Sequence, residues 1–271
     1  MSREAYDAIK AVNFSALKFI LRSPEHFLAA MEEDEERDET KYAVGNLAHA
    51  MILEGKDLRD LYAIKPAGMT FATKEGKAWR DAQTLPILKE EDSNRIPRMA
   101  EKIANHPEAS QIIRACPLRE HAITYELGGV KMKSLLDAVG NDDEGRKGFM
   151  DFKTTTDARQ WSFAKRIMDF DYDLQLEIYG GGLAICEGAH ERPWSVFVVQ
   201  ETHAPFSVQV FIPGPKMIQS GQDKLQRALE VYKKCAASDN WPGYPGGIQT
   251  IEPPEYALKK LAVEAAESSA I

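Results

Sequence analysis

The sequence predicts a mixed α/β (α+β) fold, in which a mixed central β-sheet is flanked by helices and preceded by a mainly helical N-terminal part. Two observations lead to this expectation. Helical periodicity with capping residues dominates residues 1–115, whereas from about residue 120 short apolar runs bounded by turn residues alternate with helical stretches. The later order is strand, strand, strand, helix, helix, strand, strand, helix, as expected of a sheet covered by helices.

The first 115 residues predict a series of helices. Asn13 and Ser15 are candidate N-caps of the apolar run 16–21, and Ser23 followed by Pro24 is a preferred helix start. The remaining elements expected here are helices over 42–53, 73–91 with a break at Pro86 and 93–115 with a break at Pro107, and a short strand over 61–64.

The second half predicts the sheet and the helices that cover it. Gly128-Gly129 is expected to form the turn of a hairpin, and residues 154–156 are expected to cap a helix after the third strand. The expected strands cover 121–127, 130–139, 149–153, 194–200 and 206–212, and the expected helices run to 169 and over 171–186 and 216–237. We expect a helical part over 1–115, a core over 116–245 and a tail over 246–271, which together form one compact domain.

Composition excludes several classes of protein. The 271 residues suffice for one large domain or two small ones, and no run reaches the roughly 18 apolar residues of a membrane span. No secretory leader is recognisable, so we expect a cytoplasmic protein with no membrane partner. The three cysteines fit a reducing compartment and are too few for a four-cysteine zinc site or iron–sulfur cluster, so no such cluster is expected.

The net charge is acidic but unevenly distributed. The formal charge is −8, of which the run 32–39 contributes −6 and the tail 251–271 contributes −2. The remainder of the chain is neutral, so the total charge does not decide whether the protein binds nucleic acid. We expect the acidic run to be a solvated loop.

Acidic and basic side chains converge on two adjacent strands of the predicted sheet. Asp151 and Lys153 share one face of the strand 149–153, and Asp137 lies on the strand before it. Carboxylates hold Mg²⁺, which activates a phosphoryl oxygen and water, and an ammonium group offsets the charge that develops. The pattern is typical of phosphodiester hydrolysis, although an isolated Asp-x-Lys pair is more often a surface salt bridge.

Two further features lie on predicted helices. His49 follows Gly45 by four residues in an apolar helix, where it is either a core histidine or a metal ligand. Gln175 and Tyr179 are also four residues apart, so they share one helix face, which is either ordinary half-buried surface or part of a site.

In chain order these motifs are G-x-x-x-H at 45–49, a strand Asp at 137, D-x-K at 151–153 and Q-x-x-x-Y at 175–179. This order resembles the PD-(D/E)xK nucleases of the RecB type. The wider sequence, with Asn13-Phe14-Ser15, Ser23-Pro24-Glu25-His26-Phe27 and the run GNLAHAMILEG at 45–55, is similar to their RecE-like (exonuclease VIII) branch. The resemblance extends from about residue 13 to 240, and the joint order is far more specific than any single motif.

The resemblance implies a PD-(D/E)xK nuclease core and a role for each position. Asp137 and Asp151 become carboxylate ligands of a catalytic Mg²⁺, for which Mn²⁺ is expected to substitute. His49 and the backbone carbonyl of Phe152 become further metal ligands. Lys153 becomes the catalytic residue that positions or activates the attacking water. Gln175 and Tyr179 contact DNA or support the lysine.

Several auxiliary positions remain open between a site and a solvated surface. Lys131 and Lys133, on the Asp137 face of the strand, are candidate phosphate contacts. Glu120 and Glu126 are rival candidates for an acidic position near the start of the sheet. The basic residues of the helix after D-x-K are candidates for contacting the DNA backbone, and they are Arg159, Lys165 and Arg166. Trp161 and Phe163 on this helix are expected in the core.

The resemblance implies a Mg²⁺-dependent, ATP-independent exodeoxyribonuclease that degrades linear double-stranded DNA from its ends, 5′ to 3′. The resulting 3′ single strand would serve a RecT-like single-strand annealing protein in recombination of a phage or prophage. No G-x-x-x-x-G-K-[ST] motif is present, in agreement with the absence of ATP. A homo-oligomer, such as a ring, is expected by analogy. The alternatives are another PD-(D/E)xK endonuclease or CRISPR-adaptation nuclease, and a catalytically silent DNA-end scaffold for a recombinase.

Overall fold

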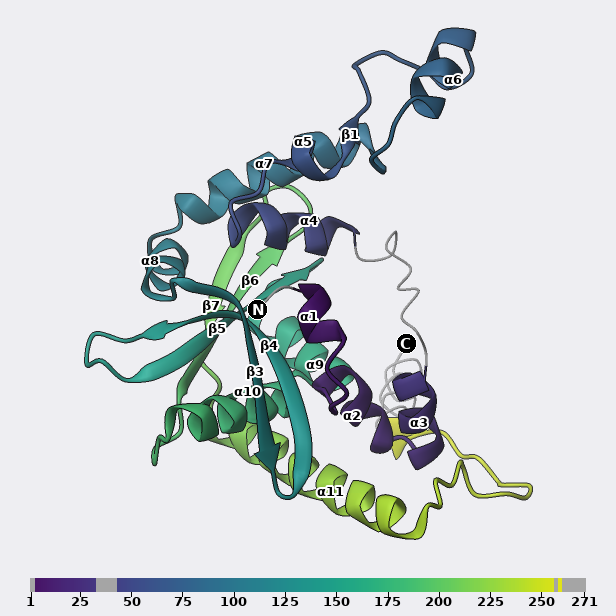
Figure 1. The fold of residues 1–271 in the computed structure, drawn as a ribbon, viewed down its shortest axis with the longest axis vertical. Coiled ribbons are helices and arrows are strands. Elements are labelled where there is room, and N and C mark those ends of the chain that lie inside the picture. The colour runs from purple at the N-terminus through teal and green to yellow at the C-terminus, as the bar shows by residue number, and fades with distance from the viewer. Residues whose placement is uncertain (1–2, 33–42, 256–257, 260–271) are drawn as a thin grey trace, which may run out of the picture.

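A five-stranded mixed sheet forms the centre of the protein (Figure 1). The structure is a computed structural model and describes residues 3–32, 43–255 and 258–259. In spatial order the strands are β3 (Leu118–Leu127), β4 (Val130–Asn141), β5 (Lys147–Thr155), β6 (Trp194–Glu201) and β7 (Val208–Phe211). Only β5 and β6 pair in parallel, and the other neighbours are antiparallel.

The parallel pair explains why two helices stand between the third and fourth strands of the sheet. A parallel connection needs a crossover, which is supplied by α9 (Gln160–Phe170) and α10 (Tyr172–Glu187). The strand β5 is buried on both faces, because Phe149 packs in one core and Met150 in the other. A strand of this kind is apolar at nearly every position, so a carboxylate within it needs a functional explanation.

Helices cover both faces of the sheet. On one face, α2 (Phe14–Ile20), α9, α10 and α11 (Pro215–Ser238) contribute to a core with fully buried Leu17, Phe163, Leu174 and Phe197. On the other face, α4 (Ala43–Ile52), α7 (Glu90–Ala104) and α8 (Pro107–Ala115) contribute to a second core with Leu47, Ile96 and Met99. The predicted mixed sheet flanked by helices is therefore confirmed. Helices from the first 115 residues lie on both faces, and the division at residue 115 stays a prediction.

The N-terminal segment is tied to the outer half of β4. Val12 forms a parallel bridge with Met132, and its backbone bonds to Lys131 and Lys133. The Lys133 ammonium donates to the carbonyls of Tyr6 and Asp7 at the end of α1 (Arg3–Asp7). The N-cap of α2 is Asn13, whose side chain accepts the N–H of Ala16, as predicted.

The segment after α11 returns to the N-terminal helices. Trp241 stacks on Phe27 of α3 (Pro24–Glu32), with ring centroids 5.3 Å apart, and the Glu25 N–H donates to the carbonyl of Pro242. Tyr244 contacts His26 and bonds to Arg22. The segment 241–244 is therefore packed against α3 and the residues just before it.

An arm projects from the edge of the molecule beyond α7 (Figure 1). It leaves the body after α5 (Leu58–Leu61) through a two-residue parallel pairing of β1 (Ala63–Ile64) with β2 (Ile87–Leu88). At its tip, α6 (Lys74–Asp81) is stabilised by the arm itself, because Trp79 stacks on Phe71 and Thr73 caps the helix. No residue between 65 and 86 belongs to either core.

Several predicted boundaries were wrong. The helix expected over 73–91 is α6, ending at Asp81, followed by β2 and the start of α7. The helix expected to begin at residue 93 is α7, which begins at Glu90. Residues 154–156 do not cap α9, because β5 continues to Thr155 in its pairing with β6. Trp161 is 65% exposed rather than in the core, whereas Phe163 is buried as expected.

Two further expectations concern the acidic run and membrane-spanning helices. The acidic run 32–39 lies outside the described residues, apart from Glu32 at the end of α3. Among the described residues, no helix is long and apolar enough to cross a membrane.

Candidate active site

The candidate site lies where β4 and β5 diverge. Their backbone pairing ends at Ala138 and Met150, so the next residues, Asp137 and Asp151, stand at the opening of a fork. The Phe152 N–H donates to Asp137 Oδ2 over 2.7 Å and holds that carboxylate across the gap. Where the two strands separate, there is space between them for charged side chains. A continuous hydrogen-bonded pairing of the strands would leave no such space.

Asp151 and Lys153 form a buried pair on β5. Asp151 is only 1% exposed, and the Lys153 Nζ lies 2.5 Å from its Oδ2. Despite this proximity, neither Asp151 oxygen makes a hydrogen bond of acceptable geometry in the described structure. Burial raises the pKa of Asp151, and the Asp137 carboxylate adds to this effect against the opposing Lys153. Burial alone would lower the pKa of Lys153, but the two carboxylates outweigh it and keep the ammonium charged.

His49 reaches the fork from α4. Gly45, one turn earlier on the same face, lets the helix approach β5, since a Cβ there would lie 3.1 Å from Thr154 Oγ1. The His49 Nε2 lies 3.3 Å from Asp137 Oδ1. Burial alone would lower the pKa of His49, but Asp137, Glu120 and Glu54 outweigh it and raise that pKa to about 9. The helix α4 therefore places the His49 imidazole beside the carboxylates of the fork.

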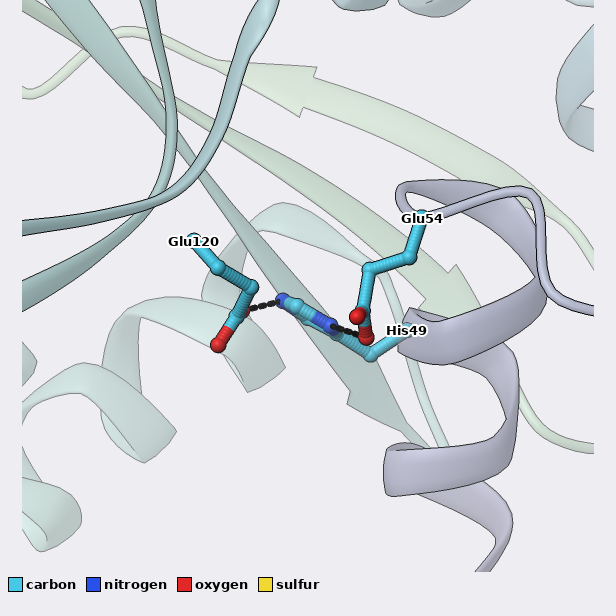
Figure 2. Close-up of side chains that lie close together, drawn as sticks. All are labelled: His49, Glu54 and Glu120. Atoms are coloured by element: carbon cyan, nitrogen blue, oxygen red, sulfur yellow. Dashed lines mark ion pairs between the residues drawn. The ribbon is translucent and has the colours of Figure 1, made fainter. Parts of the chain in front are cut away.

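Two glutamates flank His49, as Figure 2 shows. The His49 Nε2 lies 3.2 Å from Glu120 Oε1, and its Nδ1 lies 3.7 Å from Glu54 Oε1. Glu54 follows the end of α4, and its other oxygen is paired with Lys56 Nζ at 2.6 Å. No sequence motif points to Glu54, although it lies within the run 45–55. Only its position beside the helix end brings it to His49.

Glu120 interrupts the pairing of β3 with β4. The ladder pairs Arg119 with Ala138 and His121 with Leu136, but not Glu120 with Asp137. Glu120 has φ of +44°, which is unusual for a residue with a side chain and is seldom found inside a strand. Such backbone strain is often found at functional sites. Glu126, the other candidate for this acidic position, pairs with Lys131 near the turn of the hairpin. It is six residues along β3 from Glu120, or about 20 Å.

The residues of the fork fit a hard divalent cation. Such ions prefer oxygen ligands, which Asp137, Asp151 and Glu120 supply, and the buried Asp151 oxygens have only the Lys153 ammonium as a close partner. The tightest group of potential ligand atoms is a different one, because atoms of His49, Glu54 and Glu120 lie within 4.8 Å of one another. We favour the fork, because Lys56 already neutralises Glu54, whereas Asp151 is buried and incompletely paired.

The Q-x-x-x-Y residues lie on α10 behind the fork. Gln175 is buried, and its Oε1 has no hydrogen-bond partner among the described residues. Burial raises the pKa of Tyr179 well above its ordinary value, and the nearby Asp151 carboxylate adds to this. Tyr172, at the start of α10, lies under Lys153, whose Nζ is 4.6 Å from the ring centroid. Of these side chains, Tyr172 contacts Lys153, whereas the supporting roles of Gln175 and Tyr179 stay predictions.

The auxiliary basic residues differ in exposure and in their partners. The Lys133 ammonium is buried against carbonyls of the N-terminal segment, and the exposed Lys131 lies opposite Glu126. Arg159 makes a bidentate pair with Asp157, with its Nη2 2.6 Å from Oδ2. On α9, Lys165 is exposed and Arg166 lies over the Phe170 ring. Their roles as DNA contacts stay predictions, and the geometry favours them least for Lys133.

A sequence profile of the family described as a PDDEXK-like domain of unknown function (DUF3799) matches residues 13–254. The chain belongs to this PDDEXK-like family. The match spans the fork, α4 and α10, so the predicted resemblance to PD-(D/E)xK nucleases is confirmed. Membership in this family supports a nuclease.

A solved structure shares the fold of this PDDEXK-like protein. A protein from Eubacterium rectale that is provisionally named an exonuclease superposes with a TM-score of 0.58 at 12% identity, over 91% of this chain and 96% of its own. At this identity the likeness shows the fold alone. A second structure, of SSO0001, has a TM-score of only 0.34 at 13% identity over 83% of this chain and 81% of its own. No curated protein matches the sequence.

Proposed function

We propose that the protein is a Mg²⁺-dependent, ATP-independent exodeoxyribonuclease of the RecE-like type that degrades linear double-stranded DNA from its ends. The observation that carries the proposal is the Asp151 carboxylate, which is buried in a central strand without a hydrogen bond and faces a lysine. Burying such a group costs free energy unless a positive partner compensates it. A bound catalytic cation would explain why this carboxylate is buried beside the lysine, whereas a structural salt bridge alone would not.

Each residue around the fork would have a separate role in the reaction. Asp137, Asp151 and the Phe152 carbonyl would hold the cation, with His49 and Glu120 on the α4 side. When bound, the cation supplies Lewis-acid activation of the phosphoryl oxygen and of water. The Lys153 ammonium stays charged and orients the attacking water or stabilises the negative charge that develops on the phosphate. Gln175 and Tyr179 keep Lys153 and Asp151 in place.

The remaining features of the proposal follow from the RecE-like resemblance. Digestion would run 5′ to 3′ and leave a 3′ single strand for a single-strand annealing protein of the RecT type. Mn²⁺ would substitute for Mg²⁺. A homo-oligomer that encloses the DNA, such as a ring, would give processivity without an ATP motor. An acidic chain with a formal charge of −8 makes enclosure more useful than a basic surface.

Digestion of two DNA forms tests the proposal. Purified protein is incubated with end-labelled linear duplex and with closed circular duplex, with Mg²⁺ or EDTA and without ATP. We expect the linear form to disappear in Mg²⁺ only, and the circle to survive. Lys153→Gln should lower the rate by about 10²–10³-fold, as removal of a preorganised charge does. Asp142→Asn, in the polar loop between β4 and β5, is the matched surface control for Asp151→Asn.

The outcomes separate the alternatives. Cutting of the circle would indicate an endonuclease. Binding of DNA ends without cleavage in Mg²⁺ or Mn²⁺ would indicate a silent end-binding scaffold. Full activity in Asp151→Asn or Lys153→Gln would contradict the assignment of the site.

A further inference from the structure

Trp161 presents an aromatic ring to solvent in the first turn of α9. The residue is 65% exposed, and it belongs to neither hydrophobic core. Tryptophan is highly buried on average, although single exposed apolar residues are common on protein surfaces, so exposure alone is not informative. What distinguishes this ring is the way in which it is held.

The Trp161 ring is fixed by a chain of contacts to the end of β5. The Arg159 guanidinium lies over the ring, with its Cζ 5.0 Å from the centroid. Arg159 is held in turn by Asp157, with its Nε 3.0 Å from Oδ1 and its Nη2 2.6 Å from Oδ2. The Asp157 N–H donates to Oγ1 of Thr155, the buried last residue of β5. A ring held in this way loses little conformational freedom when a ligand packs on it.

The Asp157–Arg159 pair stays ionised around neutral pH. Hydrogen bonds from Arg159 hold the pKa of the Asp157 carboxyl well below its ordinary value. The support of the ring is therefore present under the conditions in which DNA is bound.

This chain of contacts begins beside the catalytic lysine. Thr155 follows Lys153 by two residues on β5, so the two side chains share one face of the strand, about 7 Å apart. Trp161 follows Lys153 by eight residues, so their Cα atoms are at most about 28 Å apart, and the turn and helix between them make the separation shorter. A duplex strand spans that upper limit in about eight nucleotides, at ~3.4 Å each. DNA with a phosphate at Lys153 can therefore reach the ring.

The surface around Trp161 is weakly positive in an otherwise acidic chain. Residues 157–170 contain three cations and two acids, against a formal charge of −8 for the whole protein, and one of the acids, Asp157, is already paired with Arg159. Lys165 lies one turn along the same face of α9, is exposed and makes no salt bridge within the described part of the chain. An exposed aromatic ring among cations is the combination that binds the bases and phosphates of an unpaired strand.

We propose that Trp161 is a base-stacking residue, on which an unpaired base of the DNA substrate packs beside the active site while Arg159 supports the ring. The face of a base becomes available only where the base pair at an end has opened, or where the strand is already single. The inference rests on the proposed function and deepens it, because stacking would favour opened ends over paired ones.

Binding measured without cleavage tests the inference. Two fluorescent hairpin duplexes have one open end each, which is fully paired in one and carries three mispaired nucleotides in the other. Their affinities for the full-length protein are measured by anisotropy in EDTA. We expect the mispaired end to bind at least about fivefold more tightly than the paired end, as one base stacked on an aromatic side chain allows.

Substitutions at Trp161 separate stacking from apolar contact. Trp161→Ala should remove most of the preference for the mispaired end, and Trp161→Phe should retain part of it because its ring can still stack. Trp161→Leu, which is apolar but not flat, should behave like the alanine variant. Lys165→Gln is the matched control, because a phosphate contact does not read base pairing; it should weaken both ends by the same factor.

Photochemical cross-linking locates the base. A hairpin with 5-iodouracil in its mispaired end is irradiated in complex with the protein, and the cross-linked peptide is identified by mass spectrometry. We expect the cross-link on Trp161. A cross-link confined to other residues would overturn the inference.

The remaining outcomes are equally decisive. Equal affinity for the two ends, or a preference that persists in Trp161→Ala, would overturn the inference even if the protein digests linear DNA. A lower oligomer mass of Trp161→Ala in light scattering would also overturn it, since the ring would then be a contact between copies of the chain. A preference that depends on Trp161 without Mg²⁺-dependent digestion would support base stacking and contradict the proposed nuclease. Thermal melting checks that each variant is folded.

Discussion

The contact between Gly45 and Thr154 leads to the most specific prediction about how the site is built. An ideal Cβ at Gly45 lies 3.1 Å from Thr154 Oγ1, so alanine requires a movement of a few tenths of an ångström, which rotation of the threonine side chain can absorb. Alanine also gains up to about 1 kcal/mol of helix stability over glycine. We therefore expect Gly45→Ala to be close to neutral in stability and to lower metal affinity by no more than about threefold.

Leucine at the same position should have a different effect. Its side chain cannot fit between α4 and β5, so the helix must move away, at a cost of about 1–3 kcal/mol for overpacking. His49, one turn further along, would move with it, and metal sites tolerate deviations of only about 0.2 Å in ligand distance. We expect Gly45→Leu to lower Mn²⁺ affinity by about tenfold or more.

The assay is calorimetric titration with Mn²⁺, together with thermal melting with and without metal. Gly181→Ala is the matched control, because Gly181 lies in α10 and its added Cβ would be at an ordinary 3.8 Å from Leu127. This control should gain stability without a change in metal affinity. A Gly45→Leu protein that binds Mn²⁺ as tightly as the wild type would refute the reasoning that the close approach of α4 positions His49.

Three further predictions concern the groups around the fork and the arm. Asp151→Asn should abolish activity yet stabilise the metal-free protein by about 1–3 kcal/mol, since burial raises the pKa of this carboxylate even with the Lys153 Nζ 2.5 Å away, and Asp137 remains to compensate the ammonium. Because burial raises the pKa of Asp151, this gain should be present at pH 8 and disappear as the pH falls below the raised pKa, which urea unfolding at several pH values would show. Glu120→Gln should lower Mn²⁺ affinity by about tenfold, whereas Glu54→Gln should have a smaller effect because Lys56 already pairs with Glu54; the reverse order in calorimetric titrations would move the metal toward Glu54. Replacing residues 66–85 by a short Gly-Ser linker should change the melting temperature by only a few degrees, because the arm contributes no residue to either core; loss of the folded state would show that the arm is structural.

The parts of the fold that follow local rules could be predicted from the sequence. The hairpin at Gly128-Gly129 and the strand at Asp151 depend on turn residues and a short apolar run, and both were found close to where they were expected. The boundaries that failed depend on tertiary contacts. Thr154 and Thr155 look like helix caps, but pairing with β6 keeps them in a strand. The helix expected over 73–91 ends at Asp81, because residues 87 and 88 pair with β1 as the strand β2.

In the candidate site, too, the features set by local sequence rules could be predicted, and those set by tertiary contacts could not. The period of two along β5 placed Asp151 and Lys153 together, and the i,i+4 spacing placed Gln175 with Tyr179. The role of Glu54 could not be predicted, since it depends on where the chain turns after α4. The choice between Glu120 and Glu126 required the interrupted ladder and the positive φ of Glu120, which no sequence rule assigns to glutamate.

Locating the metal is the most direct test of the account. A crystal soaked in Mn²⁺ and measured by anomalous scattering would show where the ion binds. The account predicts a peak at the fork, bounded by Asp137, Asp151 and the Phe152 carbonyl, that is absent in Asp151→Asn. A peak confined to His49, Glu54 and Glu120, or no peak near Asp151, would contradict it.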